Sequence, residues 1–296
     1  MILIYATALA GLAGLAFGSF LNVCITRWPN EESVATPRSH CRSCERKLAL
    51  WENIPLISFV ALRGRCRTCQ AAIGWRYPIV ELAVGGFWAL AIWKMLELTP
   101  EQNFEALSYI DLLNGFALLV FIWLLVGLAA LDAENLWLPD RLIWPGIILG
   151  FILSIARPSL ETYYINGDSA EWQHRTAVSG SYWFLGVVIG AGALLLIRFL
   201  YRLYRGTEGM GLGDVKLMAM LGGWLGARVS LVALAMGVCA TAIFAISLLA
   251  IPAMRTNRKN WRETALPFGT FLAAAGIIAG FWGQPIVSSY LHLSRF

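Results

Sequence analysis

Charged residues are scarce in this sequence. Asp, Glu, Lys and Arg make up 14% of its 296 residues, whereas 58% are hydrophobic; a soluble domain carries about 25% charged residues. Polar stretches are equally rare: residues 27–78 form the only long one, and neither an internal repeat nor a low-complexity tract is present. These absences exclude an ordinary soluble domain and indicate a polytopic membrane protein.

Long apolar runs recur along the chain, and a membrane-spanning helix needs about 20 such residues. The first run has no cationic residue before it and is longer than a signal-peptide core, so we expect a retained helix. We predict an all-α fold with about eight transmembrane helices, at residues 2–25, 79–98, 112–131, 142–156, 180–200, 215–227, 229–252 and 267–290. A second polar stretch, residues 157–179, is expected as a loop on the outer side.

The distribution of Lys and Arg predicts the orientation, because cytoplasmic loops are enriched in both. If eight helices alternate, all but five of the 23 Lys and Arg residues fall on one side; the five are Lys94, Arg157, Arg175, Arg228 and Arg295. This asymmetry places both termini outside the cytoplasm and the basic loops inside it. The net charge of +5 then reflects topology in a lipid bilayer, and no nucleic-acid partner is expected.

Four of the six cysteines lie in the polar segment as two C-x-x-C pairs, Cys41 with Cys44 and Cys66 with Cys69. This spacing is typical of a four-cysteine zinc site. The alternatives are two disulfides, which a reducing cytoplasm disfavours, or four unpaired thiols. A closed four-thiolate site leaves no open position for water, so we expect Zn²⁺ to fold the segment and to do no chemistry itself.

Two aspartates lie at the ends of apolar runs on the expected cytoplasmic side, Asp132 after the third run and Asp214 at the start of the sixth. Ionisable groups at membrane depth are costly and are functional candidates. Paired carboxylates suit peptide hydrolysis, in which one activates water and the other protonates the leaving group. The alternatives are an N-cap for Asp214 and a solvated interfacial charge for Asp132. A cap is favoured for Asp140, and Glu134 is expected as a solvated or supporting group.

Three glycines, Gly209, Gly211 and Gly213, precede Asp214. Glycine adopts backbone conformations closed to other residues and lets another chain approach closely. We therefore expect the glycines to admit an extended substrate backbone beside the carboxylate, or to let the aspartate reposition.

The motifs GSFLNV, the double C-x-x-C, WENIPL, RYPIVEL, LPD and GMGLGDVKL occur in this order along the chain. Together they resemble the type IV prepilin peptidases, membrane aspartic proteases with a Gly-x-Gly-Asp motif. The resemblance implies an inner-membrane enzyme that cuts prepilins and pilin-like subunits of type II secretion after a glycine, and that methylates the new N-terminus with S-adenosylmethionine. It assigns the catalytic pair to Asp132 and Asp214, the metal ligands to the four cysteines, and a region of methyl transfer to Gly64. Glu134 departs from the pattern, since many members have another aspartate there.

We expect three regions: a first transmembrane helix at 1–26, a cytoplasmic zinc-binding segment associated with methyl transfer at 27–78, and a transmembrane peptidase core at 79–296. Three alternatives stay open. One is a transporter with paired acids, which would place them nearer the middle of the membrane. The others are an inactive zinc-containing membrane scaffold and a different Gly-x-Gly-Asp intramembrane protease. The sequence contains no recognisable motif for binding S-adenosylmethionine.

Overall fold

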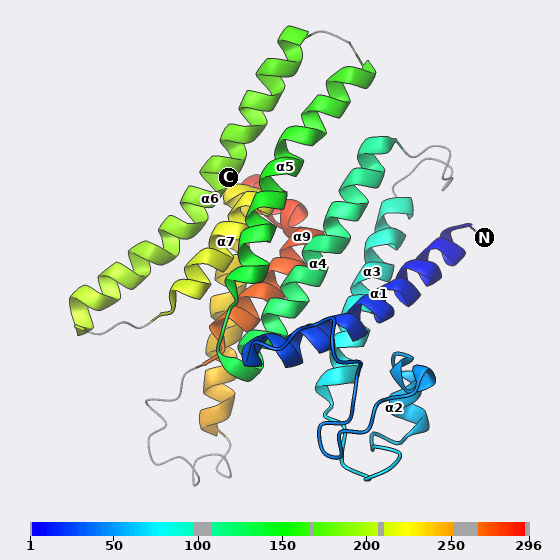
Figure 1. Ribbon diagram of the computed structural model, residues 1–296. Helices are drawn as coiled ribbons and strands as arrows, with labels where there is room; N and C mark the ends of the chain where they lie inside the picture. Colours follow the sequence, from blue (N-terminus) through cyan, green and yellow to red (C-terminus); the bar gives the residue numbers. More distant parts are fainter. Residues whose placement is uncertain (1, 98–107, 166–168, 207–209, 251–265, 294–296) are drawn as a thin grey trace. The chain divides into compact units, whose positions relative to one another are not determined.

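The computed structural model describes residues 2–97, 108–165, 169–206, 210–250 and 266–293 (Figure 1). Within these residues the chain is helical and contains no strand, which confirms the prediction of an all-α fold. The long helices are α1 (Ile2–Arg27), α3 (Arg76–Glu97), α4 (Tyr109–Asn135), α5 (Asp140–Ile165), α6 (Ser169–Arg205), α7 (Leu212–Ala250) and α9 (Phe268–Leu293). Three short helices, η1 (Trp28–Asn30), η2 (Leu50–Asn53) and α2 (Ile57–Ala61), lie between α1 and α3.

Among the described residues, six helices are long and apolar enough to cross a membrane, namely α1, α3, α4, α6, α7 and α9. The chain is therefore a multi-pass membrane protein. As far as they are described, all eight predicted segments lie in long helices. The segment 142–156 lies in α5, which is not one of the six, and the segments 215–227 and 229–252 share α7.

Helix α7 is broken at Gly226, whose backbone angles (φ 77°, ψ 166°) are not helical. Residues that carry a side chain rarely adopt these backbone angles, so the break depends on glycine. After it, the chain runs antiparallel to α9, since Val229 contacts Gly283 near one end and Phe244 contacts Phe271 near the other. Figure 1 shows the two parts of α7 in yellow and pale orange; the two segments predicted here correspond approximately to these parts.

The polar stretch 157–179 is not the loop that its composition predicted. Helix α5 continues to Ile165 and α6 begins at Ser169, so nearly the whole stretch is helical. Polar composition marks the end of an apolar run. It does not mark the end of a helix, because the backbone hydrogen bonds of a helix close within the segment itself.

The chain divides into two compact units, residues 1–130 and residues 131–296. In the first unit, α1 packs closely on α3: a Cβ added to Gly18 would lie only 2.8 Å from the Cα of Glu81. In the second unit, α6 and α7 meet backbone to backbone at Gly186 and Gly222. Small residues commonly allow such close contacts between membrane helices.

Candidate active site and metal centre

The carboxylate of Asp132 lies in the second unit, at the end of α4, and only 5% of the residue is exposed. Its Oδ2 accepts hydrogen bonds from the backbone N–H of Thr270 at 2.7 Å and from the Thr270 hydroxyl at 3.1 Å. Thr270 belongs to the first turn of α9. The N–H groups at a helix start have no partner inside the helix and attract an anion, so α9 fixes the position of Asp132.

Asp214 lies in the first turn of α7 and is half-buried. Its carboxylate interacts electrostatically with that of Asp132 and accepts a hydrogen bond from the Gly211 backbone. The structure therefore brings together two aspartates that are far apart in the sequence. Each carboxylate lies at the N-terminus of a helix, where backbone N–H groups stabilise negative charge.

Two glycines near the acids, Gly213 and Gly269, serve packing. A Cβ added to Gly213 would lie 3.0 Å from the Cβ of Leu138, and one added to Gly269 would lie 2.9 Å from its Cδ1. Leu138 thus fits between two helix starts that each carry glycine. Neither Gly211 nor Gly213 has a positive φ, and their expected role in admitting a substrate backbone beside Asp214 stays a prediction. Gly209, the first glycine of the motif, lies outside the described residues.

Two further acids were predicted as supporting groups. Asp140 begins α5 and is exposed, and both of its carboxylate oxygens accept hydrogen bonds from the Lys216 ammonium, at 2.7 and 2.9 Å. Lys216 lies one turn into α7, so this ion pair links the start of α5 to the start of α7. Glu134 is exposed at the end of α4.

Sequence reasoning missed the residues that hold Asp132 in place, Gly269 and Thr270. A Cβ on Gly269 would lie 3.0 Å from the Asp132 carboxyl carbon, so glycine here lets the carboxylate keep its position. A signal was present in the sequence LPFGTF, where a proline and a glycine open the last apolar run. Leu138, from the motif LPD, was also not assigned a role.

The four predicted metal ligands come together in the first unit. The sulfur atoms of Cys41, Cys44, Cys66 and Cys69 all lie within 4.8 Å of one another, and all four cysteines are free. The Sγ atoms of Cys41 and Cys69 are 3.7 Å apart. A tetrahedron with Zn–S bonds of about 2.3 Å has S···S edges of about 3.8 Å, so the cluster has the size that a zinc ion requires.

The two C-x-x-C turns have the same local structure. The N–H of Cys41 donates to the Arg46 carbonyl at 2.9 Å, and that of Cys66 donates to the Ala71 carbonyl at 2.8 Å. Backbone N–H groups of Cys69 and Thr68 lower the pKa of the Cys66 thiol to about 6. A thiol that ionises readily is a good metal ligand.

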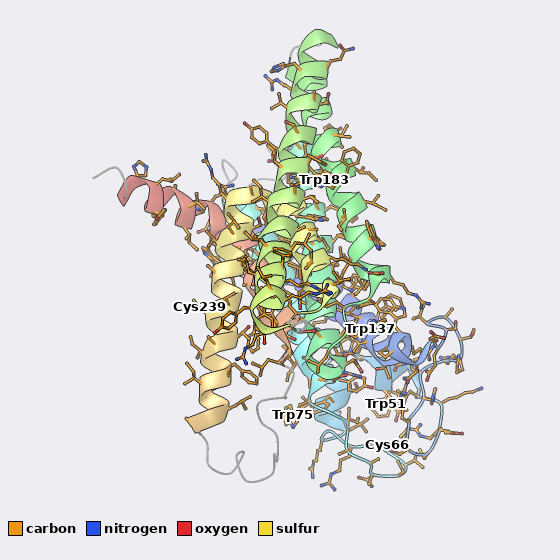
Figure 2. The ribbon with its side chains drawn as sticks, turned by 90° about the vertical axis from the view of Figure 1, so that its left-hand side faces the viewer. Trp51, Cys66, Trp75, Trp137, Trp183 and Cys239 are labelled. Atoms are coloured by element: carbon orange, nitrogen blue, oxygen red, sulfur yellow. The ribbon has the colours of Figure 1, made fainter. Side chains whose placement is uncertain are left out.

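The segment around these turns is held by a buried acid. Glu52 accepts hydrogen bonds from the Arg46 guanidinium at 2.7 and 3.0 Å and from the Ala49 N–H at 2.7 Å, and its side chain is 1% exposed. The Arg46 guanidinium, followed by the Ala49 N–H, holds the pKa of Glu52 below its usual range. Figure 2 shows Trp51, Cys66 and Trp75 on this segment.

Gly64 has a positive φ of 66°, which strains any other residue. A Cβ there would lie 3.1 Å from the ring of Phe59. Gly64 therefore shapes the turn before Cys66 and sets the position of an aromatic side chain.

The comparisons with known proteins cover both units. Residues 12–95 match the bacterial peptidase A24 N-terminal domain, and residues 119–246 match the type IV leader peptidase family. Three relatives carry the name prepilin leader peptidase/N-methyltransferase. The one from Stutzerimonas stutzeri is 33% identical over 95% of this chain and 92% of its own length. The relative from Pseudomonas putida is 31% identical over 99% of this chain and 96% of its own length. The relative from Burkholderia pseudomallei strain 1026b is 34% identical over 94% of this chain and 86% of its own length. No solved structure matches the chain significantly. The extent of these matches shows that the chain belongs to the type IV leader peptidase family.

Proposed function

We propose that this protein is a membrane aspartic endopeptidase that removes the leader peptide from type IV prepilins and from pilin-like secretion subunits. The observation that carries the proposal is the pairing of Asp132 with Asp214 at the starts of two helices. The names of the relatives support prepilins as the substrate class.

In the proposed mechanism, one carboxylate takes a proton from water while the water oxygen attacks the scissile carbonyl carbon. The other carboxyl group, which carries a proton, first hydrogen-bonds the carbonyl oxygen and then protonates the leaving nitrogen. No covalent intermediate with the enzyme forms. Thr270 orients Asp132 through two hydrogen bonds, which keeps one member of the pair fixed while the substrate binds.

We place the cut after a glycine at the cytoplasmic face of the bacterial inner membrane, with both termini of the enzyme in the periplasm. The excess of Lys and Arg on one side of the predicted topology supports this orientation. A prepilin leader is short and basic and its mature N-terminus is an apolar helix. The scissile bond therefore lies at the inner interface, where helix-end aspartates can reach it.

We further propose that the enzyme N-methylates the new N-terminal residue and that zinc folds the segment at residues 27–78. S-adenosylmethionine, when bound, supplies an electrophilic methyl group. Cys41, Cys44, Cys66 and Cys69 would hold the zinc ion, and the four thiolates close its coordination sphere. The metal then has no position left for a reacting molecule, so its part is structural.

One experiment tests both activities. The purified full-length protein is incubated with a prepilin and isotope-labelled S-adenosylmethionine, and mass spectrometry of the product reports cleavage and methylation separately. We expect a product shortened at a glycine and heavier by one labelled methyl group, and we expect neither change with the Asp132→Asn variant. An intact prepilin after incubation with the wild-type protein would refute the peptidase assignment, and a cut but unlabelled product would refute the methyltransferase assignment.

A further inference from the structure

Three sequence motifs that neither the aspartates nor the metal site explain meet at one cavity in the first unit. GSFLNV contributes Ser19 and Asn22, WENIPL contributes Glu52 and Pro55, and RYPIVEL contributes Tyr77 and Glu81. The cavity has a volume of about 530 Å³ and is also lined by the sulfur-bearing residues Cys41 and Cys66. Its size is within the range of about 300–1,000 Å³ that is typical of sites for drug-sized ligands.

Close packing of two helices positions the acid in this cavity. Because Gly18 has no side chain, α1 approaches the backbone of α3 at Glu81. Only 7% of Glu81 is exposed, and its Oε2 accepts the Leu56 N–H at 2.9 Å. The Ser19 side chain also hydrogen-bonds the carboxylate. Leu56 has a positive φ of 58°, a strained conformation for this residue type, and such strain is common at functional sites.

Glu81 has no cationic partner among the residues that the structure describes; its two partners, a backbone N–H and a hydroxyl, are neutral. The other carboxylate in the cavity differs in this respect, since Glu52 accepts two hydrogen bonds from Arg46. A buried charge without a counter-ion is costly. The cavity therefore contains one acid that is neutralised by the protein and one that is not.

A second hydrogen-bond acceptor in the cavity, the side-chain oxygen of Asn22, also lacks a partner. Asn22 is 1% exposed, and its Nδ2 donates to the Tyr77 carbonyl at 2.9 Å. Its Oδ1 is buried and has no hydrogen-bond partner.

The lining also contains four arginines, Arg27, Arg42, Arg46 and Arg67. Arg27 donates to backbone carbonyls, Arg42 and Arg46 pair with Glu32 and Glu52, and Arg67 lies over the Trp51 ring. At the end of the cavity that holds Glu81 and Asn22, an unpaired carboxylate and an unpaired amide oxygen lie beside apolar lining such as Phe20, which suits the cationic end of a ligand that is otherwise apolar or anionic.

We propose that this cavity is the site of methyl transfer and that Glu81 binds the positively charged reacting centre, an inference that rests on the methyltransferase part of the proposed function. In the reaction, the neutral amine nitrogen bonds to the methyl carbon, and the bond from that carbon to sulfur breaks with its electron pair going to sulfur. The charge of +1 thus passes from the sulfonium to the nitrogen and is lost only when the new ammonium releases its proton to water. Glu81 compensates the same charge before and after the transfer.

The positive charge that faces Glu81 has two possible sources, the sulfonium of the methyl donor or the amino group of the new N-terminus. The test uses the purified, zinc-loaded full-length protein and its Glu81→Gln variant, which keeps an oxygen that can accept the Leu56 N–H. Glu97→Gln is the matched control, because Glu97 is exposed at the far end of the same helix. Calorimetry measures the affinity for S-adenosylmethionine and for S-adenosylhomocysteine, which lacks the methyl group and the sulfonium charge.

If Glu81 faces the sulfonium, the substitution weakens binding of S-adenosylmethionine about tenfold or more and leaves S-adenosylhomocysteine nearly unchanged. The Coulomb attraction between two opposite charges in a largely buried site is worth at least that factor. If it faces the amine, both affinities stay at the wild-type value and the KM for the cleaved pilin as methyl acceptor rises about tenfold. In either case Glu81→Asp, which retains the charge, should bring the affected quantity, the affinity for S-adenosylmethionine or the KM for the cleaved pilin, most of the way back to its wild-type value.

Two results would overturn the assignment. One is a Glu81→Gln protein with wild-type affinities and a wild-type KM. The other is an equal loss of affinity for both ligands, accompanied by a loss of bound zinc and of prepilin cleavage, which would show that Glu81 only holds the fold. Failure of the proposed function itself looks different, because the wild-type protein would then cut prepilin without binding either ligand or methylating the product.

Discussion

The substitution Gly269→Ala adds one methyl group beside a proposed catalytic acid. Its Cβ would lie 3.0 Å from both the Cγ and the Oδ2 of Asp132, and 2.9 Å from the Cδ1 of Leu138. Non-bonded carbon atoms prefer separations of about 3.5–4.0 Å, so these neighbours must move by about 0.5–1 Å. The Asp132 carboxylate is already held by the N–H of Thr270 at 2.7 Å, and it cannot withdraw without stretching that bond.

A displacement of this size has a larger effect on catalysis than on stability. A misplacement of about 1 Å in a catalytic group can lower the rate about 100-fold, so we expect Gly269→Ala to reduce kcat for prepilin cleavage by about 10- to 100-fold. Overpacking costs about 1–3 kcal/mol, which is less than the typical stability of a protein, about 5–15 kcal/mol. The variant should therefore remain folded.

The assay compares cleavage rates of purified variants on one prepilin. Gly180→Ala and Gly192→Ala are matched controls, because a Cβ at either position in α6 meets no atom within 4 Å, and both should cut at the wild-type rate. Thr270→Val removes the hydroxyl bond to Asp132 but keeps the N–H bond, so its loss should be intermediate. Wild-type cleavage by Gly269→Ala would show that the position of Asp132 does not govern the reaction.

Three other predictions concern the two acids, the metal and the pH. Asp132→Asn and Asp214→Asn should each abolish prepilin cleavage, and the double variant should be no slower than either, because the pair acts as a unit; substantial cleavage by one single variant contradicts the pairing. The wild-type protein should contain about one zinc ion per chain, and replacing both Cys66 and Cys69 by serine should remove it, as elemental analysis would report; full occupancy in that variant disproves the site. The lowered pKa of Glu52 means that its contribution to stability is present above the pKa of the unfolded chain and is lost as the pH falls through the folded value. The difference in melting temperature between wild type and Glu52→Gln should thus shrink below about pH 4, and a difference that does not change with pH would contradict this reading.

The membrane helices were predictable because lipid imposes a strong compositional signal. A predicted segment lies in every long helix, although the segment in α5 is shorter than the helix, and the two segments predicted within α7 meet close to its break at Gly226. The helical structure at the end of α5 and the start of α6, within residues 157–179, was not predictable from hydropathy. That measure reports contact with lipid, whereas helix formation in a polar stretch depends on local backbone hydrogen bonds and on packing.

The candidate site was only half visible in the sequence. Asp132 and Asp214 stand out because charge is rare in apolar runs, and the cysteines stand out by their spacing. Thr270 carries no charge and is 138 positions from Asp132 in the sequence, so only the fold shows that they are hydrogen-bonded. The two C-x-x-C pairs were interpreted only as metal-ligand spacing; the matching turns around Cys41 and Cys66 became visible only in the structure.

The same structural device positions the buried acids in both units. A carboxylate inside an apolar protein needs donors that bring no side chain with them, and the backbone N–H is such a donor. Asp132 receives the N–H of Thr270 at 2.7 Å, and Glu81 receives that of Leu56 at 2.9 Å. A glycine on a neighbouring helix lies beside each acid: a Cβ on Gly269 would meet the Asp132 carboxyl group, and one on Gly18 would meet the backbone of α3 at Glu81. Both glycines therefore act by packing. A methyl group should displace the Asp132 carboxylate at the first position and push α1 away from α3 at the second.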